Sequence, residues 1–215
     1  IWQASPGQAP WVIAVLLIAA LLAWMTGFSR HGPLELLTIV DTSGWLVDDA
    51  ARRVDVLMAT LTAGQWWRLI TPDFLHFDIS HLLFNAVMLW YLGSQVEVRQ
   101  GAMRFAVLFV VCSLAGNLAQ YLLSGPLFGG LSGVVYGLLG YVWWQMHRGA
   151  RFIMPPALMV FAMVWLVLGL TPVPEWLMMS RMANGAHLGG LLAGLMVAVL
   201  MPEKKDPARR RGNEL

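Results

Sequence analysis

Charged residues are scarce in this sequence. Only 12% of its 215 residues are Asp, Glu, Lys or Arg, whereas 58% are hydrophobic. In soluble domains about a quarter of the residues are charged, so this composition argues against a soluble globular domain. The formal net charge is only +2, and the basic residues lie scattered beside apolar runs, which argues against a nucleic-acid-binding surface. We therefore expect a protein embedded in membrane lipids, with no nucleic acid among its partners.

Cysteine and the usual metal-binding motifs are also nearly absent. The single cysteine, Cys112, excludes an intrachain disulfide and leaves the redox compartment undetermined. There is no HExxH motif, and Asp and Glu are confined to the connections between apolar runs and to the tail. We therefore expect no metal and no other cofactor. A metal site built from His76, His81 and His187 is the alternative.

Long apolar runs are what the sequence has in abundance. Six are long enough, or nearly so, to form a membrane-spanning helix. They cover about 10–28, 80–96, 103–123, 132–146, 152–170 and 184–201. The sequence thus predicts an all-α polytopic membrane domain over 1–201, followed by a basic tail over 202–215. The first run is too long for a signal peptide, and because the chain begins with Ile1 we expect a preceding region to be missing.

The distribution of Lys and Arg predicts the orientation of these runs. Cytoplasmic connections are enriched in these two residues. Nine of the fourteen lie in the connections 97–104 and 147–151 and in the tail, namely Arg99, Arg104, Arg148, Arg151, Lys204, Lys205, Arg209, Arg210 and Arg211. The other five are Arg30, Arg52, Arg53, Arg68 and Arg181. Both termini should therefore be cytoplasmic, and the long 29–79 connection should face outward.

The 29–79 connection contains its own helical pattern. "GWLVDDAARRVDVLMATL", starting at Gly44, has mixed helical periodicity, and Trp45, Trp66 and Trp67 are typical of residues at a membrane interface. We expect helices that lie in the outer interface and pack on the bundle. A solvated loop is the alternative interpretation.

The fourth apolar run is unusually short and begins with a serine between glycines. From Ser132 to Met146 it would form about 22 Å of helix, less than the hydrocarbon thickness of about 30 Å. The preceding "SGPLFGG" must then enter the protein, which is tolerated only beside buried protein or a wet cavity. We expect Ser132 to lie at a helix N-terminus on the floor of a water-filled pocket.

A histidine at similar depth in the last run is the natural partner for this serine. His187 is followed by Gly190 and Gly194 on the same helical face, and small residues let membrane helices approach closely. A serine beside a histidine is the minimum for nucleophilic catalysis, in which the imidazole takes the hydroxyl proton. No carboxylate lies at this depth, so Tyr136, one turn after Ser132, could support the imidazole. The alternative is a histidine that only fixes helix packing.

A third group of polar residues lies near the start of the second run. His81 and Asn85 are four residues apart and project from one helical face. With the Ser132 backbone N–H, they could stabilise an oxyanion during hydrolysis. An interhelical hydrogen bond is the alternative role for Asn85.

Together these motifs resemble the rhomboid intramembrane serine proteases. The resemblance rests on "HLLFN", "GLSGVVYG" and "ANGAHLGGLLAG", which occur in that order, and it spans about 65–200. It implies Ser132 as the nucleophile, His187 as general base and acid, and His81, Asn85 and the Ser132 backbone as the oxyanion site. Tyr136 would pack against His187.

The resemblance also implies roles for residues outside the site. Trp67 with Arg68 and Glu97 with Arg99 would be structural pairs. His76 would be a structural residue or part of a water site.

The resemblance implies a six-helix bundle in a bacterial cytoplasmic membrane that cleaves transmembrane-protein substrates near small residues. We expect lateral substrate entry past the fifth run and the 171–182 connection. An inactive rhomboid-like membrane-protein binder and a transporter are the alternative functions. The transporter interpretation would predict more acidic groups within the membrane than the sequence contains.

Overall fold

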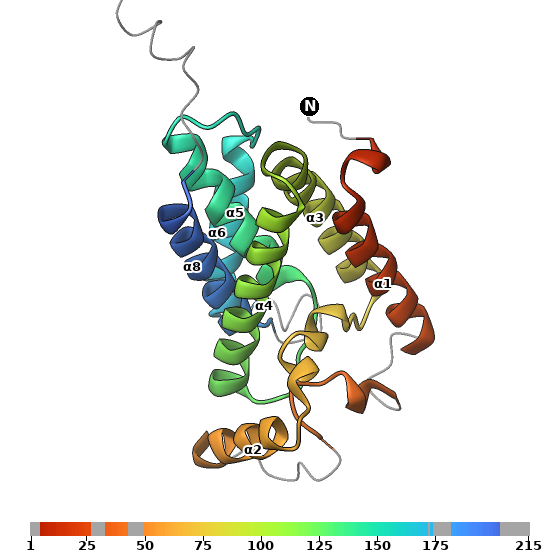
Figure 1. The fold of residues 1–215 in the computed structure, drawn as a ribbon. Helices are drawn as coiled ribbons and strands as arrows, with labels where there is room; N and C mark the ends of the chain where they lie inside the picture. Colours follow the sequence, from red (N-terminus) through yellow and green to blue (C-terminus); the bar gives the residue numbers. More distant parts are fainter. Residues whose placement is uncertain (1–4, 27–32, 43–49, 172, 174–181, 203–215) are drawn as a thin grey trace, which may run out of the picture.

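The structure is a computed structural model that describes residues 5–26, 33–42, 50–171, 173 and 182–202. The described residues form seven α-helices and no strand, which confirms the all-α class for this part of the chain (Figure 1). The helices are α1 (Pro10–Thr26), α2 (Ala50–Thr62), α3 (Ile79–Gln100), α4 (Ala102–Ser124), α5 (Ser132–His147), α6 (Pro156–Gly169) and α8 (Asn184–Leu200). Four short 3₁₀ helices accompany them, namely η1 (Pro6–Gln8), η2 (Pro33–Leu36), η3 (Trp66–Leu69) and η4 (Thr71–Phe74).

The helices differ in their ability to cross a membrane by length and hydropathy alone. Among the described residues, α4 meets both criteria, with 23 residues and a mean hydropathy of 1.8. Helices α1, α6 and α8 are apolar but shorter, between 10 and 17 residues. Helix α5 has 16 residues, or about 24 Å.

Glycines bring α8 into direct backbone contact with its neighbours. A Cβ on Gly190 would lie 1.9 Å from the Gly133 carbonyl oxygen, and one on Gly194 would lie 1.9 Å from that of Gly137. These distances leave no room for a side chain, so the α5 and α8 backbones touch. Figure 1 shows α8 (blue) beside α5. The contact fixes the relative height of the first turns of the two helices.

A buried carboxylate fastens the start of α1 to α3. Glu97 accepts hydrogen bonds from the backbone N–H groups of Trp11 and Val12, each at 2.9 Å. Both N–H groups lie in the first turn of α1, where no intrahelical partner exists. The Arg99 guanidinium lies 5.9 Å from the centroid of the Phe152 ring. Glu97 and Arg99 therefore each contact another part of the fold, as the expected structural role requires.

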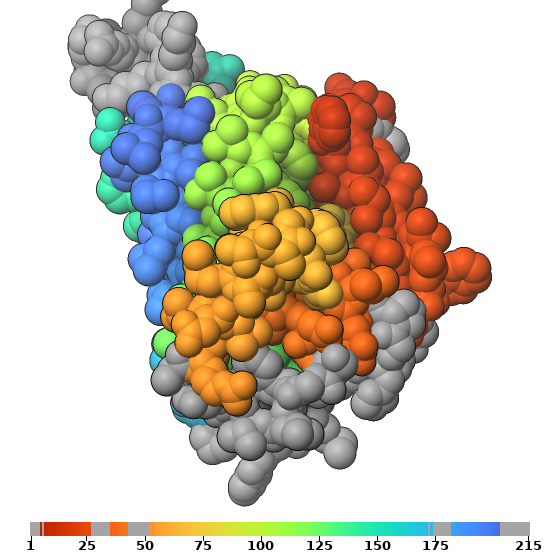
Figure 2. Space-filling view, turned by 60° about the horizontal axis from the view of Figure 1, so that its bottom comes forward, coloured from red at the N-terminus to blue at the C-terminus, as the bar shows by residue number. Residues whose placement is uncertain are grey.

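The long connection between α1 and α3 covers one end of the bundle. Helix α2 and the η3–η4 segment lie at the end opposite the start of α1 and the end of α8 (Figures 1 and 2). Arg53 of α2 donates to the Leu122 carbonyl at 2.6 Å, and the Tyr121 hydroxyl donates to the Arg53 carbonyl at 2.8 Å. These two bonds attach α2 to the end of α4.

Arg68 has a structural role in the same connection. It is 4% exposed and donates to the carbonyls of Glu35 and Thr38, at 2.6 and 2.7 Å. Its neighbour Trp67 donates its indole N–H to the Leu36 carbonyl and is half exposed. The pair thus joins η3 to the residues around η2. The expected interfacial helix starting at Gly44, with Trp45, falls partly on 43–49, outside the described residues.

Several helix ends differ from the expected boundaries. Helix α6 begins at Pro156 rather than near 152, because Pro155 is extended and proline is favoured in the first helical turn. The segment before it is held by Gln95, which accepts from the Ile153 N–H and donates to the Ile153 carbonyl. Helix α3 continues to Gln100, where Gly101 adopts a φ of 89°. Most of the expected tail, 203–215, lies outside the described residues.

Candidate active site

Ser132 is the first residue of α5 and follows a loop that packs against η4 on one side and α3 on the other. Within that loop Gly130 has a φ of 118°, a conformation that favours glycine. A Cβ on Gly130 would lie 2.8 Å from His81 Nε2 and 3.4 Å from Asn85 Nδ2. The loop therefore runs directly against the polar side chains of α3. Its end leaves the Ser132 side chain partly exposed at the helix N-terminus.

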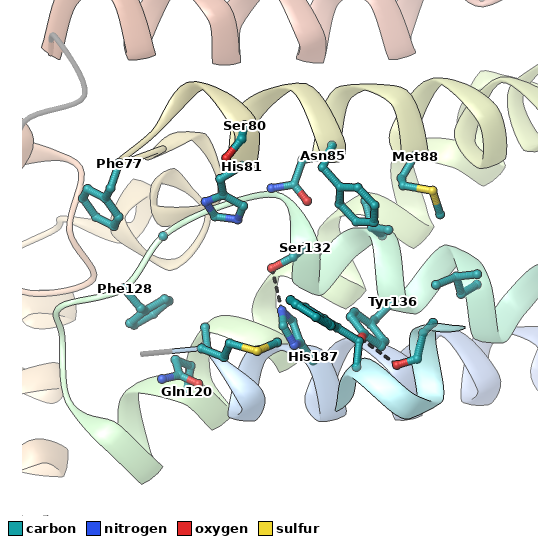
Figure 3. Close-up of a pocket in the computed structure, with 18 of the residues that line it drawn as sticks. Phe77, Ser80, His81, Asn85, Met88, Gln120, Phe128, Ser132, Tyr136 and His187 are labelled. Atoms are coloured by element: carbon teal, nitrogen blue, oxygen red, sulfur yellow. Dashed lines mark hydrogen bonds between the residues drawn. The ribbon is translucent and has the colours of Figure 1, made fainter. Parts of the chain in front are cut away.

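The structure brings Ser132 and His187 together. Ser132 Oγ lies 2.9 Å from His187 Nε2, within hydrogen-bonding distance (Figure 3). His187 is in the first turns of α8 and is only 5% exposed. Its Nδ1 is buried without a hydrogen-bond partner. An imidazole protonated at Nδ1 can accept the Ser132 hydroxyl proton at Nε2.

The Tyr136 ring stacks on the His187 imidazole. The Tyr136 and His187 ring centroids are 4.5 Å apart, with an interplanar angle of 20°. The Tyr136 hydroxyl donates to the Ala162 carbonyl of α6 at 2.8 Å, so the ring is held at both ends. The stacked ring restricts the plane of the imidazole, which is the geometry expected of a residue that orients a base.

His81 and Asn85 lie on the face of α3 that points toward Ser132 (Figure 3). Asn85 is fully buried, and its Nδ2 lies 3.1 Å from His76 Nε2. Burial lowers the pKa of His76 to about 4, so its ring is neutral at pH 7 and Nε2 can accept from the amide. The other amide hydrogen of Asn85 remains available for a bond into the pocket.

The two α3 side chains and the serine lie around a single pocket. Its volume is about 750 Å³, and its lining includes all five predicted site residues, Ser132, His187, His81, Asn85 and Tyr136. Aromatic side chains of α6, among them Phe161 and Trp165, form another wall. Such a cavity can admit an extended peptide segment and water. Whether these five residues have the predicted catalytic roles stays a prediction.

Gln120 is a pocket residue that the motifs did not single out. Its Oε1 accepts from the Ala186 N–H at 3.2 Å, immediately before His187. A Cβ on Gly185 would lie 2.9 Å from the same oxygen. Gln120 thus fixes the start of α8 from α4. The sequence carries no local signal for this contact, because the two residues are 66 positions apart.

His76, His81 and His187 are not placed to share a metal ion. His76 and His81 have ring centroids 5.0 Å apart, but His76 Nε2 is already engaged by Asn85. The described part of the chain holds no group of three or more His, Cys, Asp or Glu side chains placed to share a metal ion.

Comparison with known proteins agrees with the site. The Rhomboid domain family matches residues 63–204, which is more than half of the chain. The chain belongs to the rhomboid family. This rhomboid is 46% identical over 134 residues to "Rhomboid protease GlpG" of Salmonella choleraesuis strain SC-B67, covering 61% of the chain and 47% of the relative. It is 45% identical over the same length to the protein of that name from Salmonella newport strain SL254. The rhomboid chain therefore resembles the GlpG branch and spans about half the length of these curated relatives.

Proposed function

We propose that this chain is an intramembrane serine endopeptidase that hydrolyses peptide bonds in or near transmembrane segments of other membrane proteins. The observation that carries the proposal is the 2.9 Å contact between Ser132 Oγ and His187 Nε2 inside a pocket large enough for a peptide. Membership in the rhomboid family and similarity to relatives named rhomboid protease support it.

The reaction uses Ser132 as the nucleophile. Its hydroxyl oxygen attacks the scissile carbonyl carbon while His187 Nε2 takes the hydroxyl proton. The resulting imidazolium returns that proton to the leaving amine as the C–N bond breaks. A water molecule then attacks the acyl carbon while His187 Nε2 takes its proton, and the acyl group is released from Ser132, which regains a proton from the imidazolium. The stacked Tyr136 keeps the imidazole in place through both halves of the reaction.

The oxyanion is stabilised by groups around the start of α5. The Ser132 N–H lies in the first turn of α5, where a helix offers no intrahelical acceptor, at the positive end of the helix. Asn85 Nδ2 and the His81 ring lie beside Gly130, two residues before Ser132. Donors held in advance at this position stabilise the charge that develops on the substrate oxygen, which is the largest contribution in many acyl-transfer enzymes.

The substrates are transmembrane proteins that unwind near the cut. A transmembrane helix hides its carbonyls in backbone hydrogen bonds, so a serine can attack only an unwound segment. Small residues before the cleaved bond would fit this requirement. The α6 wall of the pocket, next to the 171–182 connection, is the proposed entry route. Residues 172 and 174–181 of that connection lie outside the described residues.

The proposed setting is the bacterial cytoplasmic membrane, with six spans and both termini in the cytoplasm. The spans are α1, α3, α4, α5, α6 and α8, with the connection through α2 in the outer interface. The start of α1 and the end of α8 lie at the same end of the bundle, as this topology requires (Figure 1). The domain would extend over 1–201, with a basic cytoplasmic tail. No metal, cofactor or nucleic acid has a part in the reaction.

Labelling with a serine-directed fluorophosphonate probe tests the proposed nucleophile. The purified chain in detergent is expected to be labelled, because His187 activates Ser132. A Ser132→Ala variant should lose all labelling, whereas Ser94→Ala, which removes a buried hydroxyl of α3 outside the pocket lining, should keep it. Labelling that persists in Ser132→Ala would contradict the assignment. A transporter would have no reason to carry an activated serine.

Asn85→Ala is expected to reduce turnover without abolishing it. Removal of one oxyanion donor costs about 10²-fold in kcat, and the Ser132 N–H and His81 would remain. KM should change little, because the lost bond forms in the transition state. Cleavage of a reconstituted transmembrane substrate measures both constants, and the thermal midpoint shows whether the variant is folded. A folded variant with no detectable turnover would mean that Asn85 is indispensable.

A further inference from the structure

A buried carboxyl group lies behind the candidate active site and takes no part in the proposed reaction. Asp73 belongs to η4 and is 1% exposed. Its Oδ1 accepts from Asn117 Nδ2 of α4 at 3.0 Å, and the same amide donates to the Leu69 carbonyl at 3.0 Å. Asp73 Oδ2 is buried without a partner, as is Ser113 Oγ on α4. Burial of a half-satisfied carboxyl group is costly and calls for an explanation.

The turn that carries Asp73 is bonded to the loop before Ser132. The Gly130 N–H donates to the Pro72 carbonyl at 3.0 Å. A Cβ on Gly129 would lie 2.5 Å from Leu75 Cβ and 3.1 Å from the Pro72 oxygen, so the loop lies directly on η4. A displacement of η4 would therefore move the glycines that separate it from the oxyanion site.

The same turn also leads into the residues that orient Asn85. His76 follows η4 by two positions, and its Nδ1 lies 3.3 Å from the Phe74 carbonyl of η4. Its Nε2 engages Asn85 Nδ2 at 3.1 Å. The position of η4 thus affects two of the proposed oxyanion donors, the Ser132 N–H through the glycine loop and Asn85 through His76.

The surroundings of Asp73 favour the protonated acid. Burial raises its pKa from 3.8 to about 7, and the nearby Ser113 hydroxyl and the bonded Asn117 amide oppose that rise. The shift places the loss of the proton at neutral pH.

Among the described residues, no cation is placed to compensate for a charge at this position. Four elements pack against η4, namely α1, α4, α5 and η3. Helix α1 has no titratable side chain, and on α4 the Cys112 thiol interacts electrostatically with Asp73. Arg68 of η3 donates to Gln65 and to two backbone carbonyls instead. The titratable side chains of α5 are Tyr136, Tyr141 and His147, so this helix has no Asp, Glu, Lys or Arg. The Tyr136 hydroxyl is bonded to the Ala162 carbonyl. An ionised Asp73 would therefore be an uncompensated buried charge.

We propose that protonated Asp73 is a positioning residue for the reaction: with Asn117 it holds η4 against α4 and thereby keeps the loop before Ser132 in its active geometry. The proposal rests on the proposed protease function. In the protonated state Oδ2–H can donate to Ser113 Oγ, which pairs two atoms that are otherwise unsatisfied. Loss of the proton leaves a buried anion that draws η4 toward water and shifts the loop.

The pH dependence of turnover tests this proposal. Small misplacements of catalytic groups cost up to about 10²-fold in rate, so we expect kcat of the wild-type chain to fall about 10-fold from pH 6 to pH 8.5. Asp73→Asn is uncharged at every pH and can still accept from Asn117 and donate to Ser113. This variant should lose the alkaline fall in kcat. Asp73→Ala lacks both bonds and should have a low kcat throughout, with KM nearly unchanged.

Thermal unfolding gives a second measurement that does not depend on cleavage. Because folding raises the pKa of Asp73, the folded chain binds the proton more tightly than the unfolded chain. The stabilisation from this proton is complete below about pH 4 and is lost as the pH rises through about 7. The thermal midpoint of the wild type should therefore fall between pH 5 and 7.5 relative to that of Asp73→Asn.

The outcomes separate this proposal from the proposed function. An active wild type and an Asp73→Asn variant with the same alkaline fall in kcat would overturn the role of Asp73 alone. So would an active wild type whose kcat does not fall up to pH 8.5. A wild type with neither cleavage nor probe labelling at any pH would overturn the proposed function, and the positioning role with it. The proposal is supported if kcat falls at alkaline pH in the wild type and does not fall in Asp73→Asn.

Discussion

Replacement of His187 with Ala is expected to lower the cleavage rate by about 10⁴-fold or more. Its Nε2 is 2.9 Å from Ser132 Oγ, and among the described residues that oxygen has no other hydrogen-bonded base. Without the imidazole the hydroxyl stays protonated and the leaving amine lacks a proton donor. The rate is measured with a transmembrane substrate reconstituted in liposomes, and folding is checked by thermal unfolding.

A double variant makes this prediction sharper. Nucleophile and base act as a unit, so Ser132→Ala with His187→Ala should be no slower than either single variant. The matched control is His147→Ala, which removes an exposed histidine at the far end of α5 and should leave the rate unchanged. Wild-type cleavage by His187→Ala, or multiplicative losses in the double variant, would contradict a Ser–His dyad.

Gly194→Ala is expected to destabilise the chain by about 3 kcal/mol, at the upper end of the range for overpacking. The new Cβ would lie 1.9 Å from the Gly137 oxygen and 2.5 Å from its carbonyl carbon. Both are backbone atoms, so no side-chain rotation can relieve the clash, and α5 and α8 must separate. Gly194 lies two helical turns beyond His187, so the loss reports helix packing rather than direct contact with the base. Thermal unfolding in a fixed detergent measures the effect.

Gly93→Ala of α3 is the matched control for this substitution. It is also a helical glycine in a buried position, but its nearest neighbours are the side-chain atoms Phe105 Cε2 and Val12 Cγ2, at 3.0 and 3.2 Å. Side chains can move by a few tenths of an ångström, and alanine also favours the helix by about 1 kcal/mol. A Gly194→Ala variant as stable as Gly93→Ala would show that the α5–α8 contact can open without cost.

Local patterns in the sequence were sufficient to place the helices and to predict which polar side chains lie around the pocket. The apolar runs predicted the cores of six helices because hydrophobicity is a property of consecutive residues. The short run beginning at Ser132 indicated a helix start inside the protein, and α5 begins at this residue. The spacing of His187, Gly190 and Gly194 indicated a close helix pair, and the glycine contacts lie on that face.

Contacts between distant residues could not be predicted in the same way. Glu97 pairs with the start of α1 across 85 positions, and Asn117 with Asp73 across 44. Neither bond produces a repeating pattern in the sequence. A buried carboxylate or amide can bond to many partners, so the sequence does not indicate which one it contacts. The 3₁₀ turns of the long connection were also missed, since each is only three or four residues long and is held by tertiary bonds such as those of Arg68.

The different attachment of α8 and α6 has an evolutionary consequence. Backbone contact with α5 sets the height of α8, and so the spacing of Ser132 and His187, whereas α6 has Ala162 as its one buried residue among those described. Mutations on α6 can therefore reshape the pocket wall past which we propose that substrates enter, while Ser132 and His187 keep their separation. Under the proposed function, substrate selectivity and catalytic chemistry can change independently in evolution, because different helices supply the residues for each.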